Sequence, residues 1–175
     1  MAVEVVTSEL VPPSEPTPRG ALWLSNLDLA ARNGYTSTVD FLRRPDDGFC
    51  RGGVGGFFSA DALRAALVPF HPFAGRLGAG PDGRAEIDCN AEGALFVVAR
   101  SAAALDDVAE GFAPSEAIRD MFVPAYESAG PGAPLLLLQV PALTTSLSLN
   151  KLISFIFGWN SCIRAWHSSC ETVKV

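Results

Sequence analysis

The feature that most limits the folds open to this chain is the run Leu-Leu-Leu-Leu-Gln-Val at residues 135–140. Strands with one face in water alternate apolar and polar residues, whereas strands covered on both faces are apolar throughout. The run therefore predicts an interior β-strand, and such a strand needs neighbours from other parts of the sequence.

The residue composition changes at the end of this run. Residues 1–140 contain ten arginines and no lysine, and Gly, Ala, Arg and Pro fill 60 of these positions but five of the last 35. Phe, Tyr, Met, Ile, Asn and Lys rise from 18 of 140 positions to nine of 35. Because the first set has GC-rich codons and the second has AT-rich codons, we expect residues 141–175 to come from sequence never selected to encode protein, such as a retained intron or a shifted frame. The alternative is an ordinary C-terminal segment.

Length and charge limit the class of protein. With 175 residues and 49% hydrophobic content, the chain can form one domain, or part of one, with a proper core. We expect residues 1–140 to form this domain and residues 141–175 to be a poorly ordered tail. The net charge is −6, and the first 140 residues alone carry −8. A nucleic-acid partner is not expected, because binding to a phosphate backbone requires a basic face.

The ends of the chain and its cysteines favour a cytoplasmic protein without a membrane span. Residues 1–11 hold two glutamates, no basic residue and no apolar run of signal-peptide length. The strongly apolar stretch at residues 152–159 is far shorter than the ~20 residues of a membrane helix. No CxxC pair is present, so we expect neither a metal site nor a redox motif, and we expect free thiols at Cys50, Cys89, Cys162 and Cys170.

Alternating and β-branched residues predict further strands. Residues 2–10 and 35–42 have this pattern. Residues 84–89 and 94–99 predict the two strands of a β-hairpin, joined by the turn Asn-Ala-Glu-Gly at residues 90–93.

Helices are predicted in three places. Ser59 suits an N-cap, and three apolar residues of the following segment fall on one face, which predicts a helix over residues 60–68. Shorter helices are expected over residues 102–110 and 116–122, whereas residues 22–29 are too mixed to classify.

Three segments, taken in order, resemble a known family. The first is Leu-Trp-Leu-Ser-Asn-Leu-Asp at residues 22–28. The second, residues 62–77, is a predicted helix that leads into Pro-Phe-Ala-Gly-Arg-Leu. The third is Asp-Gly-Arg-Ala-Glu-Ile-Asp-Cys-Asn-Ala-Glu-Gly at residues 82–93, and residues 134–140 form the next strand. Their order and spacing resemble the N-terminal part of the plant BAHD acyltransferases, and within that family the hydroxycinnamoyl transferases.

The resemblance implies a fold and a reaction. It implies an α/β chain, the incomplete N-terminal half of a two-domain, coenzyme-A-dependent acyltransferase fold of the chloramphenicol acetyltransferase type. Family members transfer an acyl group from a coenzyme A thioester, their co-substrate, to an alcohol or amine such as shikimate, quinate or a polyamine. No tightly bound cofactor is implied. The resemblance covers residues 1–140 and stops one strand before the family's catalytic H-x-x-x-D-G motif, so it implies no catalytic residue here.

The resemblance also implies residues on the acceptor side. In hydroxycinnamoyl transferases a strand of the form H-T-P-S-V-Y-F-Y contributes to the substrate pocket, and residues 35–42 correspond to it. It implies Tyr35, Thr36, Thr38 and Asp40 as substrate-binding residues, with Tyr35 in place of the family's histidine. Asp40 could pair with a cationic amine, which favours polyamines over shikimate. A solvated strand residue is the equally open alternative, because surface carboxylates are common and unpaired buried ones are costly.

Other chemically suggestive residues have plainer interpretations. His71 lies in His-Pro-Phe-Ala-Gly and is expected to pack at a helix end, because a histidine without a partner rarely defines a site. His167 and Glu171 imitate H-x-x-x-D by coincidence, and Phe-Gly-Trp-Asn at residues 157–160 imitates a late family motif. The glycine cluster at residues 52–56 fits neither phosphate-loop spacing, which predicts a surface loop.

The function stays open among three hypotheses. The first is a truncated, inactive acyltransferase. The resemblance stops before the family's catalytic histidine, and a general base contributes typically ~10² to 10⁴-fold to the rate. The alternative is a non-catalytic binding or regulatory fragment that pairs with a full-length relative, since the strand from Leu135 to Val140, left without its successors, would be an exposed edge open to self-association. The third is residual catalysis through His167 and Glu171.

Overall fold

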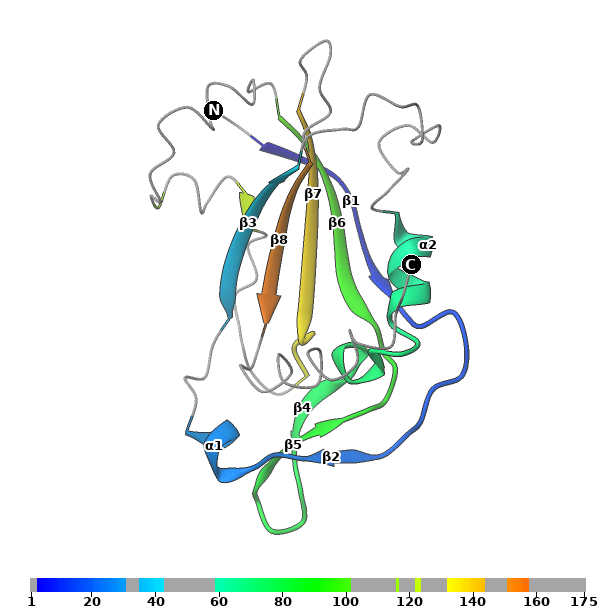
Figure 1. Cartoon of the computed structure of the whole chain (residues 1–175), viewed down its shortest axis with the longest axis vertical. Coiled ribbons are helices and arrows are strands. Elements are labelled where there is room, and N and C mark those ends of the chain that lie inside the picture. Colours follow the sequence, from blue (N-terminus) through cyan, green and yellow to red (C-terminus); the bar gives the residue numbers. More distant parts are fainter. Residues whose placement is uncertain are drawn as a thin grey trace.

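The chain forms two β-sheets with a few short helices (Figure 1). The structure, a computed structural model, describes residues 3–30, 35–42, 59–101, 116, 122–123, 132–143 and 151–157. Its elements are β1 (Val3–Val11), β2 (Ala21–Trp23), α1 (Asn26–Leu29), β3 (Thr36–Leu42), α2 (Ala60–Ala66), a 3₁₀ helix (His71–Ala74), β4 (Arg76–Ala79), β5 (Ala85–Asp88), β6 (Ala94–Ser101), β7 (Leu136–Leu143) and β8 (Lys151–Phe157).

The large sheet has the strand order β1-β6-β7-β8-β3. Strands β6 and β7 are parallel, whereas the other three pairs are antiparallel. Residues 135–140 are all buried, with exposed fractions from 0% for Leu137 to 7% for Leu136. The prediction of an interior strand covered on both faces is therefore confirmed.

The expectation that this strand is an exposed edge is wrong. Strand β6 pairs with one side of β7 and β8 with the other, so residues 137–139 and Ala142 have paired neighbours on both sides. The edges of the large sheet are β1 and β3. An association through the segment Leu135 to Val140 consequently has no open strand edge to use.

Two strands contain residues beyond Val140. Strand β7 continues to Leu143, and β8 is Lys151–Phe157. Strand β8 fills the space between β7 and β3 and pairs with β3 over all seven of its residues. The rest of the tail lies outside the described residues, so the expectations for residues 141–175 as a whole stay predictions.

The small sheet has the order β2-β5-β4. Strands β4 and β5 form a hairpin whose turn is closed by the Gly83 N–H, which donates to the Gly80 carbonyl at 2.9 Å. The predicted hairpin between residues 84–89 and 94–99 is wrong, because β5 pairs with β2 and β4 while β6 pairs with β1 and β7. Residues 89–93 instead carry the chain from the small sheet to the large one.

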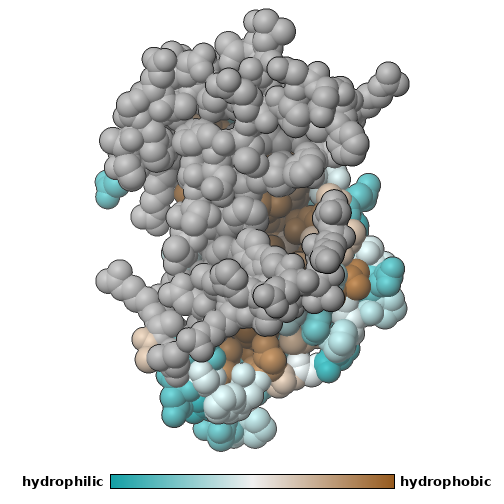
Figure 2. All heavy atoms as spheres, viewed as in Figure 1, coloured by the Kyte–Doolittle hydropathy of each residue, from teal (hydrophilic) through white to brown (hydrophobic). Residues whose placement is uncertain are grey.

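Helix α2 covers the large sheet beside β1 (Figure 1). The Ser59 hydroxyl accepts from the Ala62 N–H at 3.1 Å, which confirms the predicted N-cap. Leu63 and Leu67 bury themselves in one core with β1, β6 and β7 side chains, among them Phe96. Figure 2 shows hydrophobic residues towards the inner part of the described surface, with hydrophilic residues along its outer rim.

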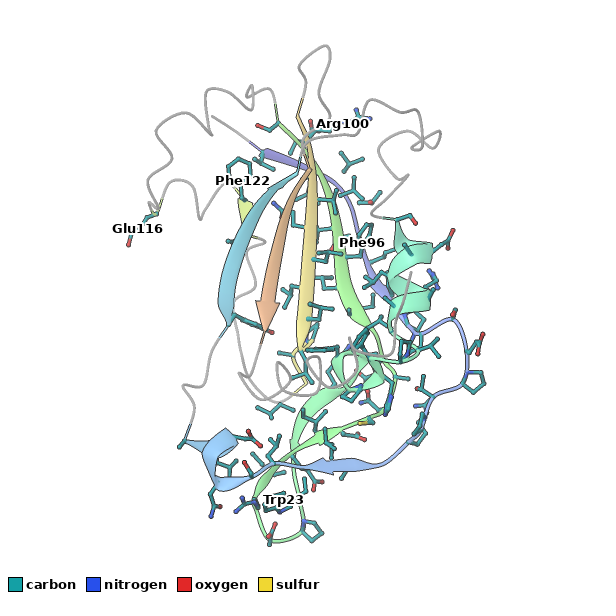
Figure 3. All side chains as sticks on the ribbon, viewed as in Figure 1. Trp23, Phe96, Arg100, Glu116 and Phe122 are labelled. Carbon is teal, nitrogen blue, oxygen red and sulfur yellow. The ribbon has the colours of Figure 1, made fainter. Side chains whose placement is uncertain are left out.

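Several predicted elements lie outside the described residues. They include the helix at residues 102–110, the glycine cluster and most of the helix at residues 116–122. Phe122, whose side chain is fully buried, is described near one end of the large sheet (Figure 3). In the described part of the chain, no helix is both long and apolar enough to cross a membrane.

Gly93 is required where the chain passes between the two sheets. Its φ is +106°, a region that residues with a Cβ rarely adopt. A Cβ at this position would also lie 2.6 Å from the carbonyl carbon and oxygen of Val11, the last residue of β1. Both the backbone conformation and the close approach of β1 therefore exclude other residues.

Replacing Gly93 with alanine should destabilise the fold by about 2 to 5 kcal/mol, because left-handed strain and overpacking add. Gly83→Ala is the matched control, since Gly83 has φ +77° but open space around its Cβ position. That control should cost only about 1 to 2 kcal/mol. Urea denaturation of the three proteins measures both effects, and equal midpoints for the two variants would contradict the argument from close approach.

Candidate functional site

The four predicted substrate-binding residues lie together at one edge of the large sheet. Thr36, Thr38 and Asp40 occupy alternate positions of β3, opposite Phe157, Phe155 and Ile153 of β8. Tyr35 immediately precedes β3 and is partly buried. The backbone thus places three of the four residues on β3 and Tyr35 directly before it, beside a strand, β8, that the sequence did not predict.

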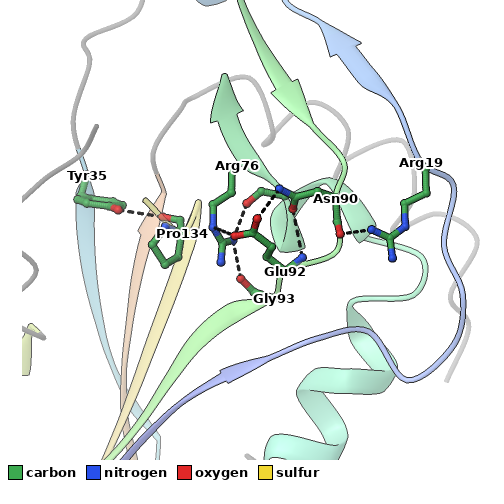
Figure 4. Close-up of polar contacts among 8 residues, drawn as sticks. Arg19, Tyr35, Arg76, Asn90, Glu92, Gly93 and Pro134 are labelled. Carbon is green, nitrogen blue, oxygen red and sulfur yellow. Dashed lines mark hydrogen bonds and ion pairs between the residues drawn. The ribbon is translucent and has the colours of Figure 1, made fainter. Parts of the chain in front are cut away.

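The Tyr35 side chain bridges to a distant part of the chain. Its hydroxyl donates to the Pro134 carbonyl at 2.8 Å, across 99 residues of sequence (Figure 4). Pro134 stands two residues before β7, and β8 separates β7 from β3. The bond therefore joins two strands that are not neighbours. Sequence patterns gave no signal for it, because a side-chain to backbone contact at this separation leaves no periodic trace.

Arg76 is a buried cation next to this bridge. Its side chain is 6% exposed, and Nη1 donates to the Gly75 and Gly93 carbonyls at 2.8 Å each. Its Nε lies 3.0 Å from Oε2 of Glu92, whose side chain is 56% exposed. The Nε–H does not point at that oxygen, so the contact is an ion pair rather than a hydrogen bond. Arg76 thus neutralises its charge while binding the carbonyls that flank β4 and β6.

The loop at residues 89–93 is held by its own side chains (Figure 4). Nδ2 of Asn90 donates to Oε1 of Glu92 at 2.9 Å, and the Glu92 N–H donates back to Oδ1 of Asn90 at 3.1 Å. A guanidinium N–H of Arg19 donates to the Asn90 carbonyl. The Gly93 N–H donates to the Ala74 carbonyl at 2.9 Å. The loop is consequently tied to the 3₁₀ helix and to the segment before β2.

The Arg76 network and the Tyr35 bridge meet at Pro134. Arg76 and Pro134 form an isolated antiparallel β-bridge, which links the small sheet to the segment that leads into β7. The neighbouring Gly75 packs closely against the end of β5, where a Cβ would lie 2.4 Å from the Asp88 carbonyl oxygen. The motif Ala-Gly-Arg of the sequence therefore has a structural explanation in the contacts of two of its residues.

Arg84 joins the first and third family-like segments. Its Nη2 donates to the Leu24 carbonyl and to Oδ1 of Asn26 at 2.8 Å each, and its guanidinium lies 4.8 Å from the centre of the Trp23 ring. Trp23, labelled at the small sheet in Figure 3, is 67% exposed. A capping box between Ser25 and α1 orders the same segment. These contacts explain why the two segments occur together in the sequence.

The remaining chemically suggestive residues form no second site among the described residues. His71 begins the 3₁₀ helix and is partly buried, while His167, Glu171 and the motif imitation at residues 157–160 lie wholly or mostly outside the described part. Within the described ranges, no group of three or more His, Cys, Asp or Glu side chains is placed to hold a metal ion. Cys89 is a free, buried thiol.

Comparison with known proteins identifies the family. The family model described as "Transferase family" matches residues 1–149. Putrescine hydroxycinnamoyltransferase 2 of Oryza sativa subsp. japonica is 55% identical over 149 residues, which is 81% of this chain and 45% of that protein. A hydroxycinnamoyl-CoA:5-hydroxyanthranilate N-hydroxycinnamoyltransferase of Avena sativa is 47% identical over 80% of this chain and 33% of that protein.

The fold matches a solved structure of similar architecture. The crystal structure of vinorine synthase superimposes with a TM-score of 0.68 and 23% identity, covering 89% of this chain and 37% of that one. The chain spans less than half the length of the curated relatives described above. The α/β acyltransferase fold expected from the sequence is confirmed for this part.

Arg76→Met should destabilise the protein by about 3 kcal/mol, because two buried carbonyls lose a charged donor. Arg64→Met is the matched control: Arg64 contacts Glu9 at 3.6 Å and Asp61 at 3.8 Å on the surface. Exposed pairs of this kind contribute under about 1 kcal/mol. Guanidinium denaturation compares the stability of the two variants. A control that loses as much stability as Arg76→Met would contradict the stabilising role of the buried Arg76 hydrogen bonds.

Burial, and secondarily the charge of Asp88, raises the pKa of the Cys89 thiol. The folded state therefore keeps its proton at a pH where the unfolded thiol, with a pKa of about 8.5, has lost it. The contribution of this raised pKa to the free energy of unfolding is fully present below the pKa of the unfolded Cys89 thiol. It is lost as the pH rises towards the pKa of the folded thiol. The stability difference between wild type and Cys89→Ala should therefore shrink above about pH 8.5. A difference that stays constant from pH 7 to 10 would contradict this.

Proposed function

This chain belongs to the Transferase family, the BAHD acyltransferases, and from that membership we propose that it serves the transfer of a hydroxycinnamoyl group from a coenzyme A thioester to an amine. The observation that carries the proposal is the 55% identity over 149 residues to a putrescine hydroxycinnamoyltransferase. The second relative is named for transfer to nitrogen as well, with a hydroxycinnamoyl-CoA donor.

The acceptor we propose is an aliphatic diamine of the putrescine class, which is cationic at neutral pH. Asp40 on β3 is the residue we assign to its ammonium group, because a carboxylate accepts charge-assisted hydrogen bonds from an ammonium. The other reading of Asp40, a solvated strand residue, predicts no effect on acceptor binding when the charge is removed. The two interpretations therefore differ in a measurable way.

The 175 residues contain no H-x-x-x-D-G sequence. We propose that these residues alone bind the acceptor without transferring the acyl group, since a general base must lie within hydrogen-bond reach of the proton that it removes. The free thiol of Cys89 agrees with a reducing compartment, and we propose the cytoplasm. The alternative function, a regulatory fragment that pairs with a full-length relative through residues 135–140, loses its support because that strand is interior.

Isothermal titration of the chain with putrescine and with shikimate tests the acceptor class. Putrescine should bind and shikimate should not, and Asp40→Asn should weaken putrescine binding about tenfold or more, the effect of losing one charged hydrogen bond. Asp61→Asn is the control, because it removes the same charge from a side chain on α2 that is 96% exposed. Preference for shikimate, or equal effects of the two substitutions, would overturn the amine assignment.

Turnover is measured in the same samples. Thiol release from coumaroyl coenzyme A in the presence of putrescine should not exceed the rate without protein. Release that exceeds this rate and disappears in His167→Ala would instead support the third hypothesis, catalysis through His167 and Glu171.

A further inference from the structure

The bond between Tyr35 and Pro134 closes across the end of a strand that lies between them. In the large sheet, β8 stands between β7 and β3, and its last residue, Phe157, pairs with Leu136 on one side and with Thr36 on the other. Tyr35 immediately precedes Thr36, and Pro134 lies two residues before Leu136. The side chain of Tyr35 therefore spans the end of β8 at the level of Phe157.

This geometry fixes the width of the sheet at one end of β3. Two inter-strand spacings of about 4.8 Å each separate β7 from β3. The side chain of Tyr35 bridges part of this distance. Among the strands that the structure describes, β3 stands at the edge and pairs with β8 alone. The hydrogen bond of 2.8 Å to Pro134 is thus a second attachment of β3, independent of its ladder with β8.

The far end of this attachment is buried and held by several contacts. Pro134 is buried, and it forms the isolated bridge with Arg76, whose guanidinium is held by the Gly75 and Gly93 carbonyls. A proline has no N–H, so its carbonyl oxygen is the one main-chain hydrogen-bonding group that it offers. Tyr35 is consequently anchored to the small sheet through a chain of contacts that does not involve β8.

The bond also limits what Tyr35 can do for a ligand. A phenol has a single O–H hydrogen, and here that hydrogen is directed at the Pro134 carbonyl. Tyr35 therefore does not donate to a carboxylate, the group that shikimate, quinate and anthranilate carry and that putrescine lacks. The expectation that Tyr35 contacts the acceptor directly is replaced by an indirect role.

We propose that Tyr35 is a positioning residue, which holds the start of β3 at a fixed distance from β7 and, by committing its hydrogen to Pro134, gives carboxylate-bearing acceptors no donor at this position. The part that concerns acceptors rests on the proposed function, whereas the part that concerns β3 does not. The residues that follow on β3, among them Asp40, depend on this attachment for their placement.

Amide hydrogen exchange of the whole chain tests the attachment without a ligand. In Tyr35→Phe, amides at the Thr36 end of β3 should exchange about fivefold faster, the effect of losing one hydrogen bond, while amides of β1 and β6 keep their rates. The control Ser59→Ala loses one hydroxyl and one hydrogen bond at the N-terminus of α2. It should leave β3 unchanged. Unchanged exchange in β3 of Tyr35→Phe would overturn the proposal.

Titration with putrescine and shikimate tests the consequence for acceptors. Tyr35→Phe should weaken putrescine binding about fivefold through the displaced strand, and Ser59→Ala should bind it like wild type. Shikimate binding by wild type that is lost in Tyr35→Phe would show direct donation and overturn the proposal, as would unchanged putrescine binding in Tyr35→Phe. If wild type binds no putrescine while β3 loosens in Tyr35→Phe, the positioning role is supported and the proposed acceptor is wrong.

Discussion

Arg76 places a positive charge where β4 of the small sheet, the start of β6 and the approach to β7 come together. A buried guanidinium is stable there because its N–H groups bind two carbonyls and Glu92 balances its charge. Both carbonyls are bound by Nη1, whose two N–H groups the planar guanidinium holds at fixed angles. The two sheets are joined through this contact, so the loop at residues 89–93, the glycines beside it and the position of Pro134 all depend on it.

The position of β3, which holds the proposed acceptor-binding residue Asp40, depends indirectly on the same junction. Strand β3 belongs to the large sheet and Arg76 to the small one, yet Tyr35 reaches Pro134, which is paired with Arg76. Residues that contact neither the acyl donor nor the acceptor can therefore influence where Asp40 lies. A polar network links the two sheets here, whereas the apolar core that includes side chains of α2, β1, β6 and β7 buries hydrophobic surface.

Sequence patterns predicted the elements whose signal is local. The N-cap at Ser59, the strand β1 and the apolar run of β7 each depend on neighbouring residues, and each is found in the structure, although the burial of β1 does not alternate: Glu4 to Leu10 are all exposed. Pairing was predicted less well, because it depends on residues far apart. The turn at residues 90–93 has the composition of a hairpin, but Gly93 turns the chain towards a different sheet. Strand β4, with a glycine among its four residues, was too short to give a signal.

The candidate site shows the same division. The resemblance placed Tyr35, Thr36, Thr38 and Asp40 on one strand; Thr36, Thr38 and Asp40 lie on β3 and Tyr35 immediately precedes it, and their roles stay predictions. The contacts of Tyr35, Arg76 and Arg84 join segments between 17 and 99 residues apart in sequence. No propensity or periodicity encodes such contacts, and only the folded arrangement reveals them.

The order of strands in the large sheet determines how early the sheet can be completed during synthesis. Leu42 and Lys151, the closest residues in sequence of the β3–β8 ladder, are still more than a hundred residues apart. At a synthesis rate of roughly 5 to 20 residues per second, β3 leaves the ribosome about 5 to 20 s before β8 can reach it. Loop closure over such a separation is slow as well as late. The edge that would carry the acceptor-binding residues is thus the last part of the sheet that synthesis allows to form.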